Sequence, residues 1–146
     1  MILHQSKNLT FFTPAETDSL GALFYDTGIS AGFPSPAEDF KEQRLSLDKE
    51  LIKNKEATFF ARVSGQSMIG AGLDDSDLLV IDRSLEPANN KIAVCFLDGE
   101  FTVKRLKVNA EGVFLQPENP NYPIIKVTSE NDFIIWGIVT NVIKKV

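Results

Sequence analysis

The stretch that decides the fold runs from residue 92 to residue 104 and reads IAVCFL-DG-EFTVK. Two apolar, strand-like runs flank Asp98-Gly99, and this dipeptide is a strong signal for a two-residue type I′ β-hairpin. Similar β patterns continue on both sides of the hairpin. We therefore expect strands over residues 58–63, 77–82, 91–97, 100–108, 113–116, 124–127 and 133–143.

The last of these strands, 133–143, is apolar on both faces. A strand of this kind either lies inside a sheet or is an edge strand that a partner covers. Because it stands at the end of the chain, we favour coverage by a partner, and with it a homodimer.

Upstream of the strands the pattern changes. The apolar residues of segment 47–52 share one helical face, and Ser46 or Asp48 is the expected N-cap. Residues 1–31 hold only short apolar clusters, which predict an arm that packs on something rather than a domain. The sequence thus predicts a mainly β body with one or two short helices and a short N-terminal arm.

Composition excludes several kinds of site. The 146 residues carry a formal net charge of −5, which argues against direct nucleic-acid binding, since phosphate contacts need an excess of Lys and Arg. One Cys and one His exclude an internal disulfide and a Cys-based or multi-His metal site, and argue against a Ser-His-Asp triad. Asp74, Asp75 and Asp77 lack the ligand order of a calcium loop, so a solvated turn is expected there. No metal and no cofactor are expected.

The same composition predicts where the protein works. No apolar run approaches the length of about 18 residues that a membrane-spanning helix needs. The first residues lack the pattern of a secretion signal, and Cys95 is free. We expect a cytoplasmic protein without a membrane contact.

Two residues could support nucleophilic chemistry without histidine. Ser67 follows an expected strand and precedes a Gly-rich turn, where backbone N–H groups could form an oxyanion hole. Lys104 lies in a strand, two residues after Thr102, whose hydroxyl could hold its amine. A lysine serves as a base only if burial lowers its pKa from about 10.4. From spacing alone, a turn-forming serine and a solvated lysine are the more common outcomes.

Segment 30–36, SAGFPSP, joins small residues to two prolines, which favour extended backbone at the residues before them. The segment is expected to be extended and easily entered by a protease. On this evidence alone a plain linker is favoured.

Five separated motifs then occur in a fixed order: FPSPA (33–37), EQR (42–44), SGQSM (64–68), DLLVID (77–82) and DGEFTVK (98–104). Their order and spacing resemble the LexA-like self-cleaving Ser/Lys peptidases, the S24 family, and within it the UmuD-type proteins of SOS mutagenesis. The match runs from about residue 29 to the C-terminus. It implies a β body like that of LexA and the signal peptidases.

The resemblance also implies roles for single residues. Ser67 would be the nucleophile and Lys104 the general base, with Thr102 orienting the lysine. The backbone N–H groups of Ser67 and Gln66 would bind the oxyanion. The bond cut would be Ala31–Gly32, an Ala-Gly pair of the LexA type where UmuD-type proteins usually carry Cys-Gly; the missing DNA-binding domain favours the UmuD-type branch.

Cleavage there would divide the chain into a removable arm, 1–31, and a β-rich peptidase-like domain, 32–146. The resemblance implies that a RecA–single-stranded-DNA filament favours the cleavable arrangement. The product would join a UmuC-type error-prone DNA polymerase for lesion bypass. Whether the arm is cut within its own chain or across a dimer stays open.

Two other functions are compatible with the residues. A non-catalytic dimeric binding module that regulates polymerase or RecA would leave Ser67 unpaired and Lys104 in solvent. A leader peptidase shares the Ser/Lys chemistry but normally carries a membrane anchor. The distance between Ser67 Oγ and Lys104 Nζ, together with the burial of Lys104, separates the first alternative from a peptidase.

Overall fold

A computed structural model of the chain describes residues 2–15, 22–25 and 42–146. The chain forms two compact units, Met1–Ala15 with Asn54–Val146, and Glu16–Lys53. The described residues are mainly β, as the sequence predicts, with one short α-helix and two 3₁₀ turns, η2 (Lys55–Ala57) and η3 (Ile69–Ala71). No helix among them is long and apolar enough to cross a membrane.

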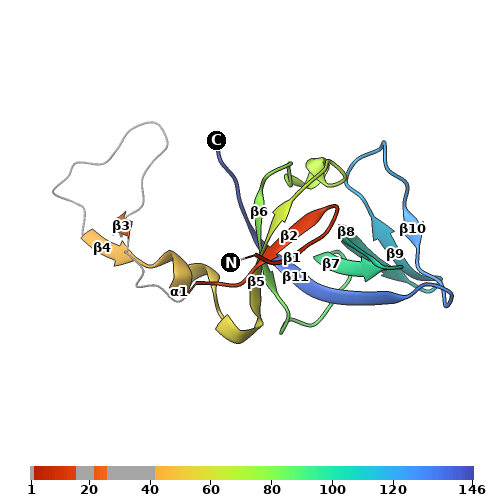
Figure 1. Ribbon diagram of the computed structural model, residues 1–146, viewed down its shortest axis with the longest axis horizontal. Coiled ribbons are helices and arrows are strands. Elements are labelled where there is room, and N and C mark those ends of the chain that lie inside the picture. The colour runs from red at the N-terminus through yellow and green to blue at the C-terminus, as the bar shows by residue number, and fades with distance from the viewer. Residues whose placement is uncertain (1, 16–21, 26–41) are drawn as a thin grey trace. The chain divides into compact units, whose positions relative to one another are not determined.

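The first unit is built on one nine-stranded antiparallel sheet, which curls around its inner face (Figure 1). The strand order is β1-β2-β5-β6-β11-β7-β8-β9-β10. The strands are β1 (Ile2–Gln5), β2 (Leu9–Phe12), β5 (Thr58–Val63), β6 (Leu78–Asp82), β7 (Ile92–Leu97), β8 (Glu100–Asn109), β9 (Gly112–Gln116), β10 (Ile125–Lys126) and β11 (Phe133–Ile143).

The central hairpin is present as expected. β7 and β8 pair in register from Ile92↔Arg105 to Leu97↔Glu100. Asp98 has φ +48° and Gly99 φ +91°, and a type I′ turn needs positive φ at both of these positions. All seven expected strands form, and their ends differ from the expected ones by at most one residue.

The prediction that a partner covers the last strand is wrong. β11 lies inside the sheet, where it pairs with β6 along one edge and with β7 along the other. Both its faces are apolar because they enter different parts of the core: Trp136 and Val142 pack against one hydrophobic cluster, and Phe133 and Ile135 against another. The expected homodimer loses this support.

The N-terminal residues belong to the same sheet. β2 pairs with β5, and Leu9 and Phe11 are each only 1% exposed within the core. The expected arm thus packs, in its first part, on the β body itself. The Ala31–Gly32 bond lies outside the described residues, so the division between 1–31 and 32–146 stays a prediction.

The second unit contains β3 (Ala22–Tyr25) and β4 (Glu42–Leu45), which pair antiparallel, followed by α1 (Leu47–Leu51). Ser46 is the N-cap of this helix, because its hydroxyl accepts the N–H of Lys49. Of the two expected caps, Ser46 is therefore the one used.

Candidate active site

Ser67 lies in the turn that follows β5 and leads into η3. The turn needs glycine at position 65, where φ is +112°, and the Gly65 N–H donates to Asp75 Oδ1 at 2.9 Å. On the other side, Asn119 Nδ2 donates to the carbonyl oxygen of Gln66 at 2.9 Å. These two bonds fix the backbone on either side of Gln66 and so position the Ser67 hydroxyl.

Lys104 reaches this turn from β8. Its side chain is buried, with 6% of the residue exposed. Nζ lies 2.6 Å from Thr102 Oγ1, 3.1 Å from the carbonyl oxygen of Val103 and 3.2 Å from Ser67 Oγ. The structure thus brings Ser67, Lys104 and Thr102 together, and a solvated lysine is the wrong interpretation.

Burial lowers the pKa of Lys104 from its ordinary value of 10.5, because the charged amine is desolvated. The negative charge of a Cys95 thiolate would oppose this shift, but burial raises the pKa of the Cys95 thiol to about 12, so the thiol stays neutral. All three hydrogen-bond partners of Nζ are uncharged oxygens, and Lys104 forms no ion pair with the described residues. The site therefore makes the neutral amine, the form that can accept a proton, easier to reach than it is for a lysine in water.

Ser67 and Lys104 open on a cavity of about 280 Å³. Its walls include residues 7–9, residues 63–68, Leu73, the β8 residues 102–104, and Tyr122, Pro123 and Ile125. A cavity with mixed apolar and polar walls beside a hydrogen-bonded serine and lysine is suited to bind a short stretch of peptide.

The backbone N–H groups of Gln66 and Ser67 are available beside the hydroxyl. Neither donates to an acceptor in the part of the chain that the structure describes. Free N–H groups next to a nucleophile are what an oxyanion hole requires. The oxyanion role of Gln66 and Ser67 stays a prediction.

Asn119 is a positioning residue that the sequence did not reveal. It lies in the segment 119–123, which reads simply as a rigid, proline-containing loop. In the structure Asn119 is buried, its amide holds Gln66, and its Oδ1 accepts the N–H of Asn121 at 3.0 Å. No local signal marks it, because its partner is distant in the sequence.

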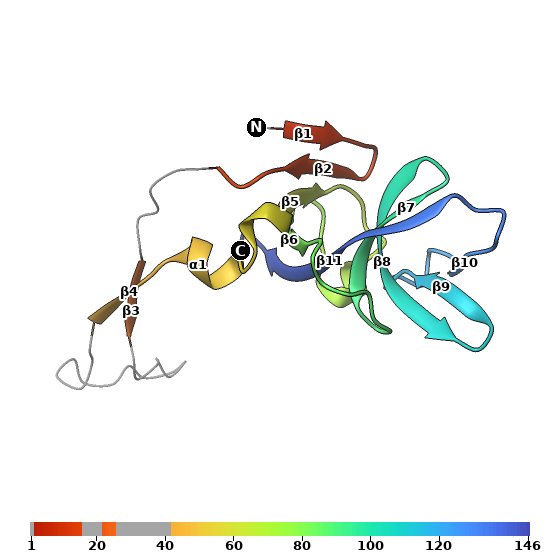
Figure 2. The same cartoon turned by 90° about the horizontal axis from the view of Figure 1, so that it is seen from below.

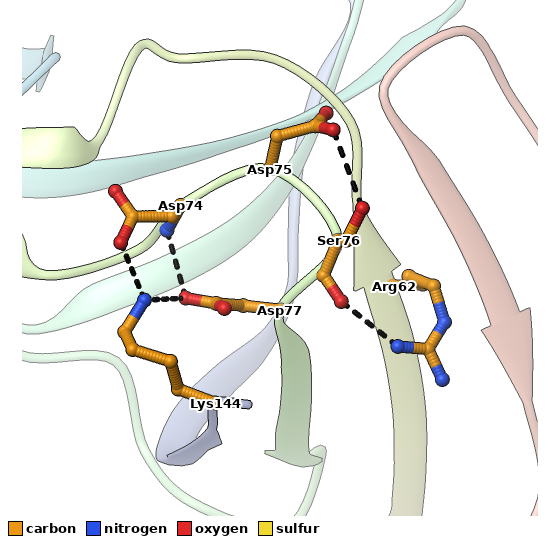
Figure 3. Close-up of polar contacts among 6 residues, drawn as sticks. All are labelled: Arg62, Asp74, Asp75, Ser76, Asp77 and Lys144. Atoms are coloured by element: carbon orange, nitrogen blue, oxygen red, sulfur yellow. Dashed lines mark hydrogen bonds and ion pairs between the residues drawn. The ribbon is translucent and has the colours of Figure 1, made fainter. Parts of the chain in front are cut away.

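Asp74 and Asp75 of the acidic turn are exposed, as expected, but a lysine holds two of the carboxylates of this turn (Figure 3). Lys144 Nζ donates to the carboxylates of Asp74 and Asp77, and Asp77 also accepts the Asp74 N–H at 2.8 Å. Burial raises the pKa of Asp77, but these hydrogen bonds outweigh it and hold the pKa below its ordinary value. The expected solvated turn is wrong for Asp77, which is buried.

The described residues contain no group of three or more His, Cys, Asp or Glu that could hold a metal ion.

Gly70 offers a test of how tightly the Ser67 turn is packed. Its N–H donates to the carbonyl oxygen of Glu118 at 2.7 Å, and a Cβ at position 70 would lie 2.5 Å from that same oxygen. Because this oxygen belongs to the backbone and is held by the Gly70 N–H, it cannot easily move aside, and Gly70→Ala should lower the free energy of unfolding by about 1–3 kcal/mol. Urea unfolding measures the change. The matched variant Ile69→Ala, at a position 44% exposed, should stay close to wild type; equal stability of all three proteins would contradict the packing.

Comparisons with known proteins agree with this geometry. Residues 23–140 match the family described as Peptidase S24-like. The chain is 42% identical over 119 residues to the protein MucA of Salmonella typhimurium, with 81% of each chain covered. It is 40% identical over 132 residues to the protein ImpA of Shigella flexneri, with 90% of each covered. It is also 39% identical over 116 residues to the LexA repressor of Delftia acidovorans, covering 80% of this chain and 51% of the repressor.

Proposed function

Because this chain belongs to the Peptidase S24-like family, we propose that it is a self-cleaving serine endopeptidase that cuts its own Ala31–Gly32 bond. Ser67 is the nucleophile and Lys104 the general base. The observation that carries the proposal is the 3.2 Å approach of Lys104 Nζ to Ser67 Oγ, with the amine buried and unpaired with any described acid.

The reaction follows from the arrangement of these groups. The neutral Lys104 amine takes the proton of Ser67 Oγ as this oxygen attacks the carbonyl carbon of Ala31. The oxyanion that forms is stabilised by the N–H groups of Gln66 and Ser67. When the C–N bond breaks, the Lys104 ammonium returns the proton to the leaving amine of Gly32. The neutral lysine then takes a proton from water as this water attacks the ester carbon. When the C–Oγ bond breaks, the Lys104 ammonium returns that proton to Ser67 Oγ, and the Ala31 carboxylate is released.

Thr102 orients the base in this scheme. Its hydroxyl lies 2.6 Å from Lys104 Nζ, on the same strand. Because the lysine side chain is long and flexible, a fixed partner near its end reduces the freedom that must be lost before proton transfer. Thr102 thereby acts through Lys104, as a positioning residue.

Tethering makes the attack effectively unimolecular, which is worth about 7 to 11 kcal/mol when the groups are aligned. A tether of about 3.3 Å per residue between positions 31 and 67 is long enough for cleavage within one chain or across a dimer. An aligned site would cut every chain at once, so cleavage needs a condition that populates the aligned state.

The family also supports a place in SOS mutagenesis. On this proposal an activated RecA–single-stranded-DNA filament shifts the chain toward the cleavable arrangement, and residues 32–146 then serve a UmuC-type DNA polymerase as a dimeric accessory subunit. The net charge of −5 fits a protein that reaches DNA through its protein partners. The non-catalytic binding module is less well supported, since it expects Lys104 in solvent.

The stimulated reaction can be tested at neutral pH. The chain mixed with RecA, ATP and single-stranded DNA should yield two products, residues 1–31 and 32–146, whose masses identify the cut bond. Omitting ATP should leave the chain intact over the same time. A filament that cleaves a LexA repressor in a parallel tube but leaves this chain whole would contradict the SOS role.

A further inference from the structure

The β1–β2 hairpin is built into the catalytic unit, although it precedes the bond proposed to be cut. β2 pairs with β5 from Leu9↔Val63 to Phe12↔Phe60, and the Ser64 N–H donates to the carbonyl oxygen of Asn8 at 2.8 Å. β1, β2 and β5 lie side by side at one end of the sheet (Figure 2). The hairpin thus contributes two strands to the sheet that carries the site.

The hairpin also fills the core. Leu9 and Phe11 are each 1% exposed. The Phe11 ring meets the rings of Phe101 and Trp136 edge-on, with centroids 4.8 and 4.9 Å apart. Without the hairpin these rings would face water, and β5 would become an open edge strand with unpaired N–H and C=O groups.

The turn of the hairpin forms part of the active-site cavity. Residues 7–9 line that cavity together with Ser67 and Lys104. Asn8 Nδ2 donates to the carbonyl oxygen of Phe101 at 3.2 Å, which ties the turn to β8, the strand of Lys104. The hairpin is therefore one wall of the cavity in which the dyad works.

We propose that this hairpin stays bound after the chain is cut, so that the product is a two-chain complex of residues 1–31 with residues 32–146. Hydrolysis after residue 31 breaks none of the pairings or packing contacts of residues 2–12. It removes only the tether, and with it the high effective concentration that the tether provided. Release requires a strand pair to break and two buried apolar side chains to enter water.

This proposal rests on the proposed self-cleavage, because the two-chain complex forms naturally only if the chain cuts itself. How tightly the hairpin binds does not depend on what makes the cut. A partner that takes the hairpin away must cover the edge of β5, most simply with an extended segment that adds as a strand and fills the space of Leu9 and Phe11 with apolar side chains. Until then the cavity keeps all its walls in the cut protein.

The test makes the cut independently of the protein's own chemistry. The recognition sequence of a site-specific protease is inserted between Ala31 and Gly32 in the full chain carrying Ser67→Ala, and that protease is added. After cutting, the two pieces should co-elute in size-exclusion chromatography at micromolar protein and separate only in denaturant. Elution of the N-terminal piece apart from the body, whether the body stays folded or precipitates, would overturn the proposal.

Two variants of β2 identify the contacts responsible. Phe11→Ala, on the buried face, should weaken retention of the cut fragment by about a hundredfold or more. Phe12→Ala loses the same atoms from the opposite face of the strand and should retain the fragment far better. Equal retention in the two variants would contradict the role of the core face. The main test uses the chain without either β2 substitution, and co-elution of its two pieces is decisive by itself. The test therefore stands even if the Phe11→Ala chain fails to fold. If the wild type never cuts itself, but the protease-cut chain retains its N-terminal piece, the proposed self-cleavage is refuted and the retention of the hairpin is not.

Discussion

Replacing Ser67 by alanine is expected to leave the chain whole under conditions that cut the wild type completely, a loss of about 10⁴-fold or more in rate. Oγ is the only atom of this turn that the scheme uses to form a bond with the substrate. The variant should keep its fold, because among the described residues Oγ is hydrogen-bonded only to Lys104, and that lysine keeps Thr102 and Val103 as partners. The measurement is the fraction of intact chain against time.

Lys104→Ala should cause a loss of similar size, since a nucleophile and its base act as a unit. The matched control is Lys91→Ala, which removes an exposed lysine immediately before the neighbouring strand β7. That variant should cut at the wild-type rate. Cleavage by Lys104→Ala at more than a small fraction of the wild-type rate would show that another group accepts the proton.

The second large effect is a steep rise of the cleavage rate with pH. Only the neutral amine of Lys104 can act as a base, so the rate should rise about tenfold per pH unit while pH lies below the pKa of this lysine. Burial lowers that pKa from 10.5, so the rise should end in a plateau that begins below pH 10.5.

The profile is measured as first-order rates of loss of intact chain between pH 7 and pH 10.5, with circular dichroism as a check on folding. A carboxylate base would already be ionised at pH 7 and would give a flat profile. A rate that stays constant across this range would therefore count against a lysine base that titrates within it.

The sequence predicted the strands well because their signals are local. The Asp98-Gly99 turn fixes the β7–β8 pairing, and the Ser46 cap fixes the start of α1. β1 and β2 escaped prediction because their apolar residues, Ile2-Leu3 and Leu9 with Phe11-Phe12, form short clusters without a clear alternation. β11 was placed wrongly because two apolar faces are compatible with both a central strand and a covered edge strand, and only the sheet order distinguishes them.

In the candidate site, too, features with a local sequence signal could be predicted and features that depend on distant contacts could not. Ser67, Lys104 and Thr102 could be selected by their motifs, but the burial of Lys104 could not. It depends on the packing of β8 and on a turn 37 positions away in the sequence. Asn119, which holds the Gln66 carbonyl from a distance of 53 positions, has no local signature at all.

The central claim is that the chain cuts itself after Ala31 with Ser67 as the nucleophile. The most direct measurement is the mass of the products when wild type and Ser67→Ala are incubated alone, side by side, at alkaline pH. We expect two fragments from the wild type, one ending at Ala31 and one beginning at Gly32, and a single intact mass from Ser67→Ala. The same two fragments from Ser67→Ala, or a wild type that stays whole or is cut at another bond, would contradict it.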